Sequence, residues 1–166
     1  ASISDGSAIN SLQLTNVYIL TTERTASASE LVINGLNPYI NVVQIGQNTT
    51  GKFQASFLLY DAPAPGFSRS QVNPDHTYAM LPLVFKTANA SGNTDYVNGL
   101  VPDIAIDEDY ANLGMLGDVS EPFLATALNE IIPGFRHAPR PNNTDLEEIS
   151  ESKANSPLYQ IMLAEN

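Results

Sequence analysis

The sequence of 166 residues has no cysteine and no tryptophan, and it is poor in basic side chains. Without cysteine, neither a disulfide nor a thiolate metal site can form. Seven Lys and Arg against eighteen Asp and Glu give a formal net charge of −11. This charge disfavours nucleic acid and anionic lipid as partners, because both are recognised by clustered positive charge. The sequence also lacks any run of about 18 apolar residues, so we expect no membrane-spanning segment.

Hydrophobic residues make up 43% of the chain, which is typical of a folded domain with a core. Their pattern predicts an α/β arrangement, in which apolar runs indicate buried strands and a 3.6-residue period indicates helices. We expect extended segments over 16–21, 39–45, 52–60, 77–87 and 102–106, a hairpin return strand starting at 96–97, a short extended piece over 12–14, and helices over 26–36 and from Ser120 to Pro133.

The pattern also predicts the setting of Lys52, of Pro82 and of one long loop. Alternation in 52–60 places Lys52, Gln54 and Ser56 on the face opposite Phe53. Pro82 lies inside the predicted strand 77–87, where the lost N–H favours a sheet edge or a bulge. The loop 61–74 is long and rich in proline, and we expect it to border a substrate groove.

Ser27 lies where the first predicted strand turns into the first predicted helix. When a serine attacks a carbonyl carbon, the carbonyl oxygen becomes an oxyanion. The free N–H groups and the helix dipole at such a turn can stabilise this oxyanion. Lys52 follows 25 positions later, after a Thr-Thr-Gly turn. A lysine can serve as general base toward a serine when burial favours its neutral form.

The stretch Thr25-Ala26-Ser27-Ala28-Ser29-Glu30, together with Thr49-Thr50-Gly51-Lys52, resembles the C-terminal processing peptidases, also called tail-specific proteases. These are Ser–Lys serine peptidases with a crotonase-like core. The segment from Tyr96 to Asp103 resembles the end of the family's catalytic core, and the resemblance covers roughly residues 15–107. The segment 73–80 resembles Bacteroidetes-type secreted or lipid-anchored members.

The resemblance implies an α/β fold: a crotonase-like (ClpP/crotonase) core fragment with a mixed sheet and flanking helices. Residues 1–134 would be the C-terminal part of the catalytic core, and 135–166 a linker and tail rich in proline and charge. Ser27 would be the nucleophile, Lys52 the general base, and the N–H of Ala28 an oxyanion donor. A lysine-orienting glutamine is usual four residues after the lysine, where this chain has Ser56, so either Gln54 or Ser56 could take that role.

The resemblance also implies what lies around the site. The partner would be a peptide or unfolded protein substrate, with no cofactor and no metal. The second oxyanion donor would come from an upstream half of the same protein. The expected protein partner is that upstream half or another copy of the chain in a homo-oligomer. The family acts outside the cytoplasm, in the periplasm or at the cell surface. We expect the fragment alone to be inactive.

Other interpretations of the same residues stay open. The pattern Ser27-x-x-Glu30 before an apolar run is also a capping box, and Lys52 after a turn is also typical of a solvated strand residue. Glu30 reads as an ordinary acid at a helix start. A non-catalytic peptide-binding or assembly module on the same fold is the main alternative function. A crotonase-type acyl-group enzyme would require the Ser–Lys pair to be accidental.

Overall fold

The computed structural model describes residues 11–137, 146–147 and 149–150 of the chain. Its strands form three small sheets. The main sheet contains β1 (Asn16–Thr21), β2 (Asn41–Gly46) and β7 (Ile104–Ala105), which lie side by side in the order β1-β2-β7. All of its strands are parallel, with Tyr18 opposite Val43 and Ile45 opposite Ile104. The connection from β1 to β2 runs through helix α1 (Ala28–Leu36), as parallel strands require.

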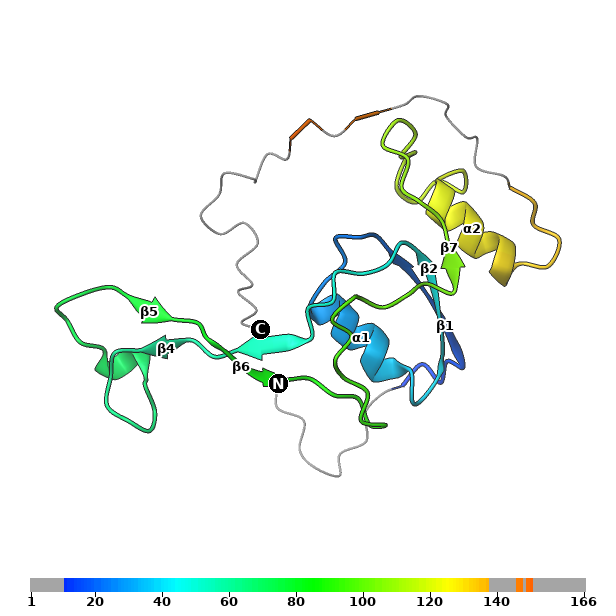
Figure 1. Cartoon of the computed structure of the whole chain (residues 1–166). Helices are drawn as coiled ribbons and strands as arrows, with labels where there is room; N and C mark the ends of the chain where they lie inside the picture. The colour runs from blue at the N-terminus through cyan, green and yellow to red at the C-terminus, as the bar shows by residue number, and fades with distance from the viewer. Residues whose placement is uncertain (1–10, 138–145, 148, 151–166) are drawn as a thin grey trace.

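The main sheet lies between α1 and the second helix, α2 (Pro122–Ile131) (Figure 1). Gln44 and Ile45 are neighbours in β2 and therefore point to opposite faces, yet both are almost fully buried. This burial fits a strand covered on both sides. The ring of Phe123 from α2 lies against Gly46 at the end of β2, and Ile33 of α1 is also buried.

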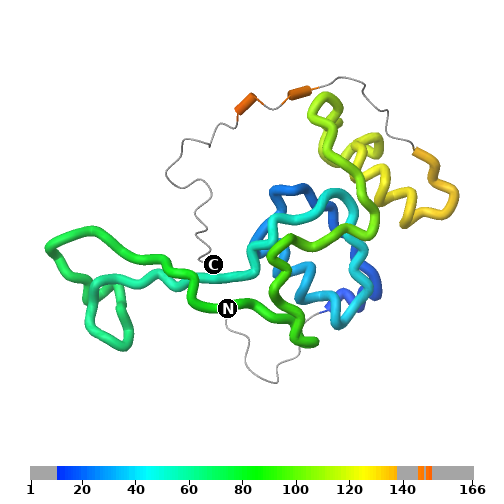
Figure 2. Tube along the Cα trace, in the orientation of Figure 1, coloured from blue at the N-terminus to red at the C-terminus, as the bar shows by residue number. Residues whose placement is uncertain are grey.

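Within the chain between β2 and β7, residues 54–86 form a long arm that projects away from the main sheet (Figures 1 and 2). Its base pairs β3 (Gln54–Ser56) with β6 (Leu83–Lys86), and its far part pairs β4 (Leu59–Tyr60) with β5 (Ala79–Met80); both pairs are antiparallel. A short 3₁₀ helix, η1 (Arg69–Gln71), lies in the loop at its end. Apolar side chains are widely exposed along the arm, at Phe57, Leu58, Tyr78, Met80, Leu81 and Val84.

The prediction of an unbroken strand over 52–60 is wrong. Pairing starts at Gln54, its register shifts between Ala55 and Ser56, and the strand resumes as β4. Lys52 therefore precedes the strand, and the apolar face predicted for this segment is not continuous, since Phe53 is buried and Phe57 is exposed. The prediction of one strand over 77–87 is wrong as well: β5 and β6 are separate strands, and the break between them contains Pro82, which has no N–H to pair.

The predicted return strand at 96–97 is also wrong, because this segment is a turn. Asp95 has a φ of 59°, outside the range of a strand, and the backbone of Leu100 is hydrogen-bonded to Thr49 instead of to a hairpin partner. The piece 12–14 forms no strand. Helix α2 starts as predicted near Pro122, but its cap is Glu121 rather than Ser120.

The α/β class is confirmed, with two helices and small sheets. The prediction of one mixed sheet is wrong for the described residues, because the main sheet is all parallel and the antiparallel pairs form separate sheets in the arm. The crotonase-like core and the division into 1–134 and 135–166 stay predictions. Most of the predicted linker and tail lies outside the described residues.

Candidate active site

Ser27 occupies the position just before α1 in a backbone conformation that non-glycine residues rarely adopt. Its φ is 58° and its ψ is −113°. Such a conformation costs on the order of 1–3 kcal/mol and persists only where surrounding contacts impose it. The same kind of sharp, strained turn from strand to helix presents the nucleophile of the α/β hydrolases. Ser27 and the next two residues are exposed, so the hydroxyl is accessible to a substrate.

Ser27 and Glu30 have the arrangement of a capping box, so this interpretation of the motif is partly right. Its carboxylate half is well formed: the N–H of Ser27 donates to Oε2 of Glu30 at 2.8 Å. The Ser27 side chain itself makes no well-formed cap hydrogen bond. The Ser27 side chain nevertheless faces the backbone N–H of Glu30, as in a capping box, so the hydroxyl lies at the helix start without an ordinary hydrogen bond to it.

Glu30 is more than an ordinary acid at a helix start, because it is fully buried. Its Oε1 accepts from the hydroxyl of Thr49 and from the N–H of Gly51, both at 2.6 Å. Its Oε2 accepts from the N–H of Ser27 and from the N–H of Lys52, both at 2.8 Å. One carboxylate thus holds the main chain of the predicted nucleophile and of the predicted base.

Further hydrogen bonds join the segment 47–52 to the loop that leads into α1. The N–H of Gln47 donates to the carbonyl of Thr21 at 2.8 Å. The N–H of Thr50 donates to the carbonyl of Thr25 at 2.9 Å, and its hydroxyl donates to the carbonyl of Glu23 at 2.9 Å. These bonds run from the carboxyl end of β1 toward the start of the arm, so the two motif segments form one unit.

The turn 96–100 closes against this unit. The N–H of Thr49 donates to the carbonyl of Leu100 at 3.1 Å, and the N–H of Leu100 donates to the hydroxyl of Thr49 at 2.7 Å. Gly51 and Gly99 both have positive φ and make close backbone contacts. A Cβ on Gly51 would lie 2.4 Å from the carbonyl oxygen of Val97, and one on Gly99 would lie 1.9 Å from that of Thr49. Only glycine fits at either position.

The other predicted site residues lie near this unit. Ala28 is the first residue of α1, where its N–H has no partner within the helix. Lys52 is half-buried, and its side chain makes no hydrogen bond to the Ser27 hydroxyl in the part of the chain that the structure describes. Gln54 and Ser56 lie in β3, opposite Lys86 and Leu83. The contact between hydroxyl and amine, and the choice between Gln54 and Ser56, stay predictions.

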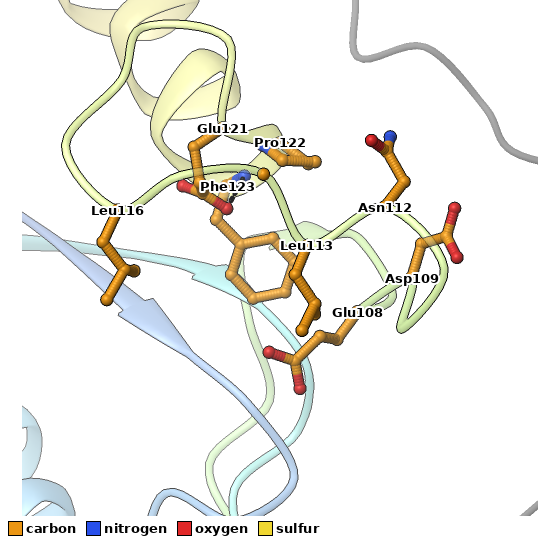
Figure 3. Close-up of a pocket in the computed structure, with 9 residues that line it drawn as sticks. Glu108, Asp109, Asn112, Leu113, Leu116, Glu121, Pro122 and Phe123 are labelled. Carbon is orange, nitrogen blue, oxygen red and sulfur yellow. Dashed lines mark hydrogen bonds between the residues drawn. The ribbon is translucent and has the colours of Figure 1, made fainter.

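Other parts of the molecule carry polar groups without forming a comparable site. A cavity of about 330 Å³ lies between the loop 108–116 and the start of α2, lined by Glu108, Asp109, Asn112, Leu113, Gly114, Leu116, Glu121, Pro122 and Phe123 (Figure 3). The described residues contain no cluster of three or more His, Asp or Glu side chains that could hold a metal ion. No helix among them is long and apolar enough to cross a bilayer.

Sequence reasoning proposed Ser27 and Lys52 as site residues but did not foresee the hydrogen bonds by which Glu30 and Thr49 join their segments. Glu30 belongs to a common capping pattern, which gives no sign that its carboxylate reaches a turn 19 to 22 residues later. The available signal was the Thr-Thr-Gly turn itself, because successive N–H groups next to a glycine of positive φ form a concave site for an anion. That anion is a side chain of the protein.

Comparisons with known proteins bear on this site. No family model matches the chain, and no curated protein matches it. A solved chain does match: a candidate S41 protease from Bacteroides fragilis NCTC 9343, known from a crystal structure, with 32% sequence identity and a TM-score of 0.59. The match covers 72% of this chain and 28% of the neighbour's, so the chain spans little more than a quarter of that protein's length.

The neighbour supports a relationship with the S41 proteases and suggests a protease function. It agrees with the resemblance to a peptidase family carried by residues 25–30 and 49–52.

Proposed function

We propose that this chain carries the Ser–Lys pair of a serine endopeptidase of the C-terminal processing type, which cleaves peptide bonds in protein substrates. One observation carries the proposal: an accessible serine in a strained turn from strand to helix shares a buried carboxylate with the backbone of Lys52. Strained non-glycine residues concentrate at functional sites, and a structural cap has no need of such strain. The 32% identity to a candidate S41 protease adds to this support.

In the proposed mechanism, the Ser27 hydroxyl attacks the scissile carbonyl carbon and loses its proton to the neutral Lys52 amine. The carbonyl oxygen becomes an oxyanion that accepts a hydrogen bond from the N–H of Ala28. Lys52 then returns the proton to the leaving amine, which gives an acyl-enzyme. Water, deprotonated by Lys52, hydrolyses this ester and regenerates the serine.

The full site needs more than this chain. We propose that an upstream half of the protein supplies the second oxyanion donor and part of the substrate groove, and that Gln54 or Ser56 orients the lysine. The substrate is a peptide or an unfolded protein segment, and the protein acts outside the cytoplasm, as the family resemblance implies. The activity proposed here therefore belongs to the full-length protein.

The test uses the full-length protein, with its upstream half, and an unstructured peptide as substrate. Ser27→Ala and Lys52→Ala should each abolish cleavage. Matched controls should retain it: Ser29→Ala removes an exposed serine two positions away, and Lys86→Ala removes an exposed lysine that pairs with Asp95. Cleavage that survives Ser27→Ala would refute the mechanism.

A second candidate is a non-catalytic peptide-binding or assembly module, and the projecting arm favours it. Its two-stranded ribbons leave edges to which an extended peptide could add as a further strand. Apolar side chains such as Phe57 and Tyr78 are exposed beside those edges. Peptide binding without turnover by the full-length wild-type protein would favour this function over proteolysis.

A further inference from the structure

The carboxylate of Glu30 is buried at a cost that an ordinary helix cap does not incur. Burying a charged group without hydrogen bonds is strongly unfavourable, and a buried carboxylate is tolerated when its lone pairs are satisfied. Glu30 is fully buried and accepts four hydrogen bonds of 2.6 to 2.8 Å. One of these would suffice for a capping box. The other three come from a distant turn, so they need another explanation.

Each carboxylate oxygen of Glu30 accepts two of the four hydrogen bonds. Oε2 accepts from the backbone N–H groups of Ser27 and Lys52, and so fixes the start of both functional segments. Oε1 accepts from Thr49 and Gly51, and so holds the turn that precedes Lys52. Thr49 passes the constraint on, because its hydroxyl also accepts from the N–H of Leu100 at 2.7 Å.

We propose that Glu30 and Thr49 are positioning residues that hold the nucleophile and the base in one rigid frame. This inference rests on the proposed Ser–Lys function. The frame acts on backbone: it imposes the strained conformation of Ser27 and sets where the Lys52 side chain begins. A misplacement of about 1 Å between reacting groups can lower a rate about 10²-fold, so such a frame contributes to turnover rather than to substrate binding.

Glu30→Gln tests the frame with little change of shape. An amide presents one oxygen and one NH₂ group, so it cannot accept from donors at both ends as the carboxylate does. The NH₂ group of the glutamine would then face at least one of the groups that now donate to the carboxylate, and that hydrogen bond would be lost. We expect kcat for the unstructured peptide to fall about 10²-fold while KM stays within about twofold, because the substrate does not contact Glu30.

Glu121 provides the matched control. It also caps a helix, accepting from the N–H groups of Phe123 at 3.0 Å and Leu124 at 2.7 Å. It lines the cavity of Figure 3, and no predicted site residue is among the residues that line this cavity. Glu121→Gln therefore perturbs a helix start by the same chemistry and should leave kcat within about twofold of wild type. Equal kcat in Glu30→Gln and Glu121→Gln would overturn the proposal, as would an effect confined to KM.

Variants of Thr49 test the same proposal if Glu30→Gln does not fold. Thr49→Val removes the hydroxyl at nearly constant shape, and we expect kcat to fall about tenfold, since it loses one of the four bonds to Glu30 and the link to Leu100. Thr49→Ser keeps the hydroxyl and should restore kcat. A Thr49→Val enzyme with wild-type kcat, or a Thr49→Ser enzyme as slow as Thr49→Val, would contradict a positioning role.

Ser27→Ala in the same assay distinguishes failure of the proposed Ser–Lys function from failure of the positioning role. If Ser27→Ala still cleaves, the proposed function fails and the positioning role fails with it. If Ser27→Ala is inactive while Glu30→Gln and Thr49→Val keep full kcat, the Ser–Lys function stands and only the positioning role is wrong.

Discussion

Helices α1 and α2 begin in different ways, although each start has a glutamate that accepts backbone hydrogen bonds. At α2, the cap Glu121 has an ordinary extended backbone (φ −62°, ψ 129°), is partly exposed, and is followed by Pro122. At α1, the cap Ser27 is strained, and the glutamate three residues later is fully buried and bonded to a distant turn. The contacts at the start of α2 are sufficient to begin a helix. The start of α1 has more contacts, and more strain, than a helix start requires.

This contrast separates structure from function. A helix start needs a few satisfied N–H groups, which Glu121 and Pro122 supply without strain. The start of α1 stores strain at Ser27 and offsets it through contacts elsewhere, chiefly those of Glu30 and of the turn at Gly51. Such an arrangement is expected where a reactive side chain must be held in one place.

The largest expected effect comes from Lys52→Arg in the full-length protein. Arginine keeps the positive charge but does not lose its proton, so it cannot accept one from Ser27. We expect cleavage of an unstructured peptide to fall about 10²–10⁴-fold, the usual contribution of a general base. Lys86→Arg is the control, and a Lys52→Arg enzyme of normal rate would exclude a base at this position.

Gly51→Ala should break the turn that surrounds Glu30. The added Cβ would lie 2.4 Å from the carbonyl oxygen of Val97, in a backbone with φ of 92°. We expect a loss of about 3 kcal/mol of stability, seen as a lower thermal unfolding midpoint of the full-length protein. Gly92→Ala has a similar φ of 80° but open space around it, so it should cost only about 1 kcal/mol. Equal shifts in the two variants would mean that the close contact is unimportant.

Ser27→Gly should stabilise the protein relative to Ser27→Ala, since glycine adopts positive φ without a steric penalty. The expected difference is about 1 kcal/mol, measured as the shift in unfolding midpoint between the two inactive variants. At the other helix, Glu121→Gly should gain nothing over Glu121→Ala, because φ there is already negative. If glycine gave no advantage at Ser27, the strain assigned to this residue would be wrong.

The smallest effect concerns Asp118, just before α2. Hydrogen bonds from the side chain and the backbone N–H of Ser120 lower the pKa of Asp118 below its ordinary value. A lowered pKa means that the ionised carboxylate favours the folded state, so its small stabilisation is present above the ordinary aspartate range and is lost as pH falls through the lowered pKa. NMR titration should show the low midpoint, and Ser120→Ala should return it toward the ordinary range. An unchanged midpoint would contradict this cause.

Local patterns along the chain were enough to predict much of the fold. The strand ending at Thr21, the helix ending at Leu36 before Asn37-Pro38, and the helix beginning at Pro122 all lie close to their predicted bounds. Each depends on contacts within a few residues, namely periodicity, caps and proline.

The errors lie where partners are distant in sequence. The expected strand at 96–97 is a turn because Leu100 bonds to Thr49, about fifty residues earlier. The candidate serine and lysine could be recognised from their motifs, but the carboxylate that joins their segments could not. Glu30 has the local pattern of a cap, and only the folded chain brings Gly51 and Lys52 to it.

The most direct test of the Ser–Lys site is to treat the full-length protein with a fluorophosphonate and identify the modified residue by mass spectrometry. Such a reagent phosphonylates a serine whose hydroxyl is activated by a base and presented to an oxyanion site. We predict modification at Ser27 that is lost in Lys52→Ala and retained in Ser29→Ala and Lys86→Ala. Absence of modification at Ser27, or modification at an unchanged rate in Lys52→Ala, would contradict the proposed pair.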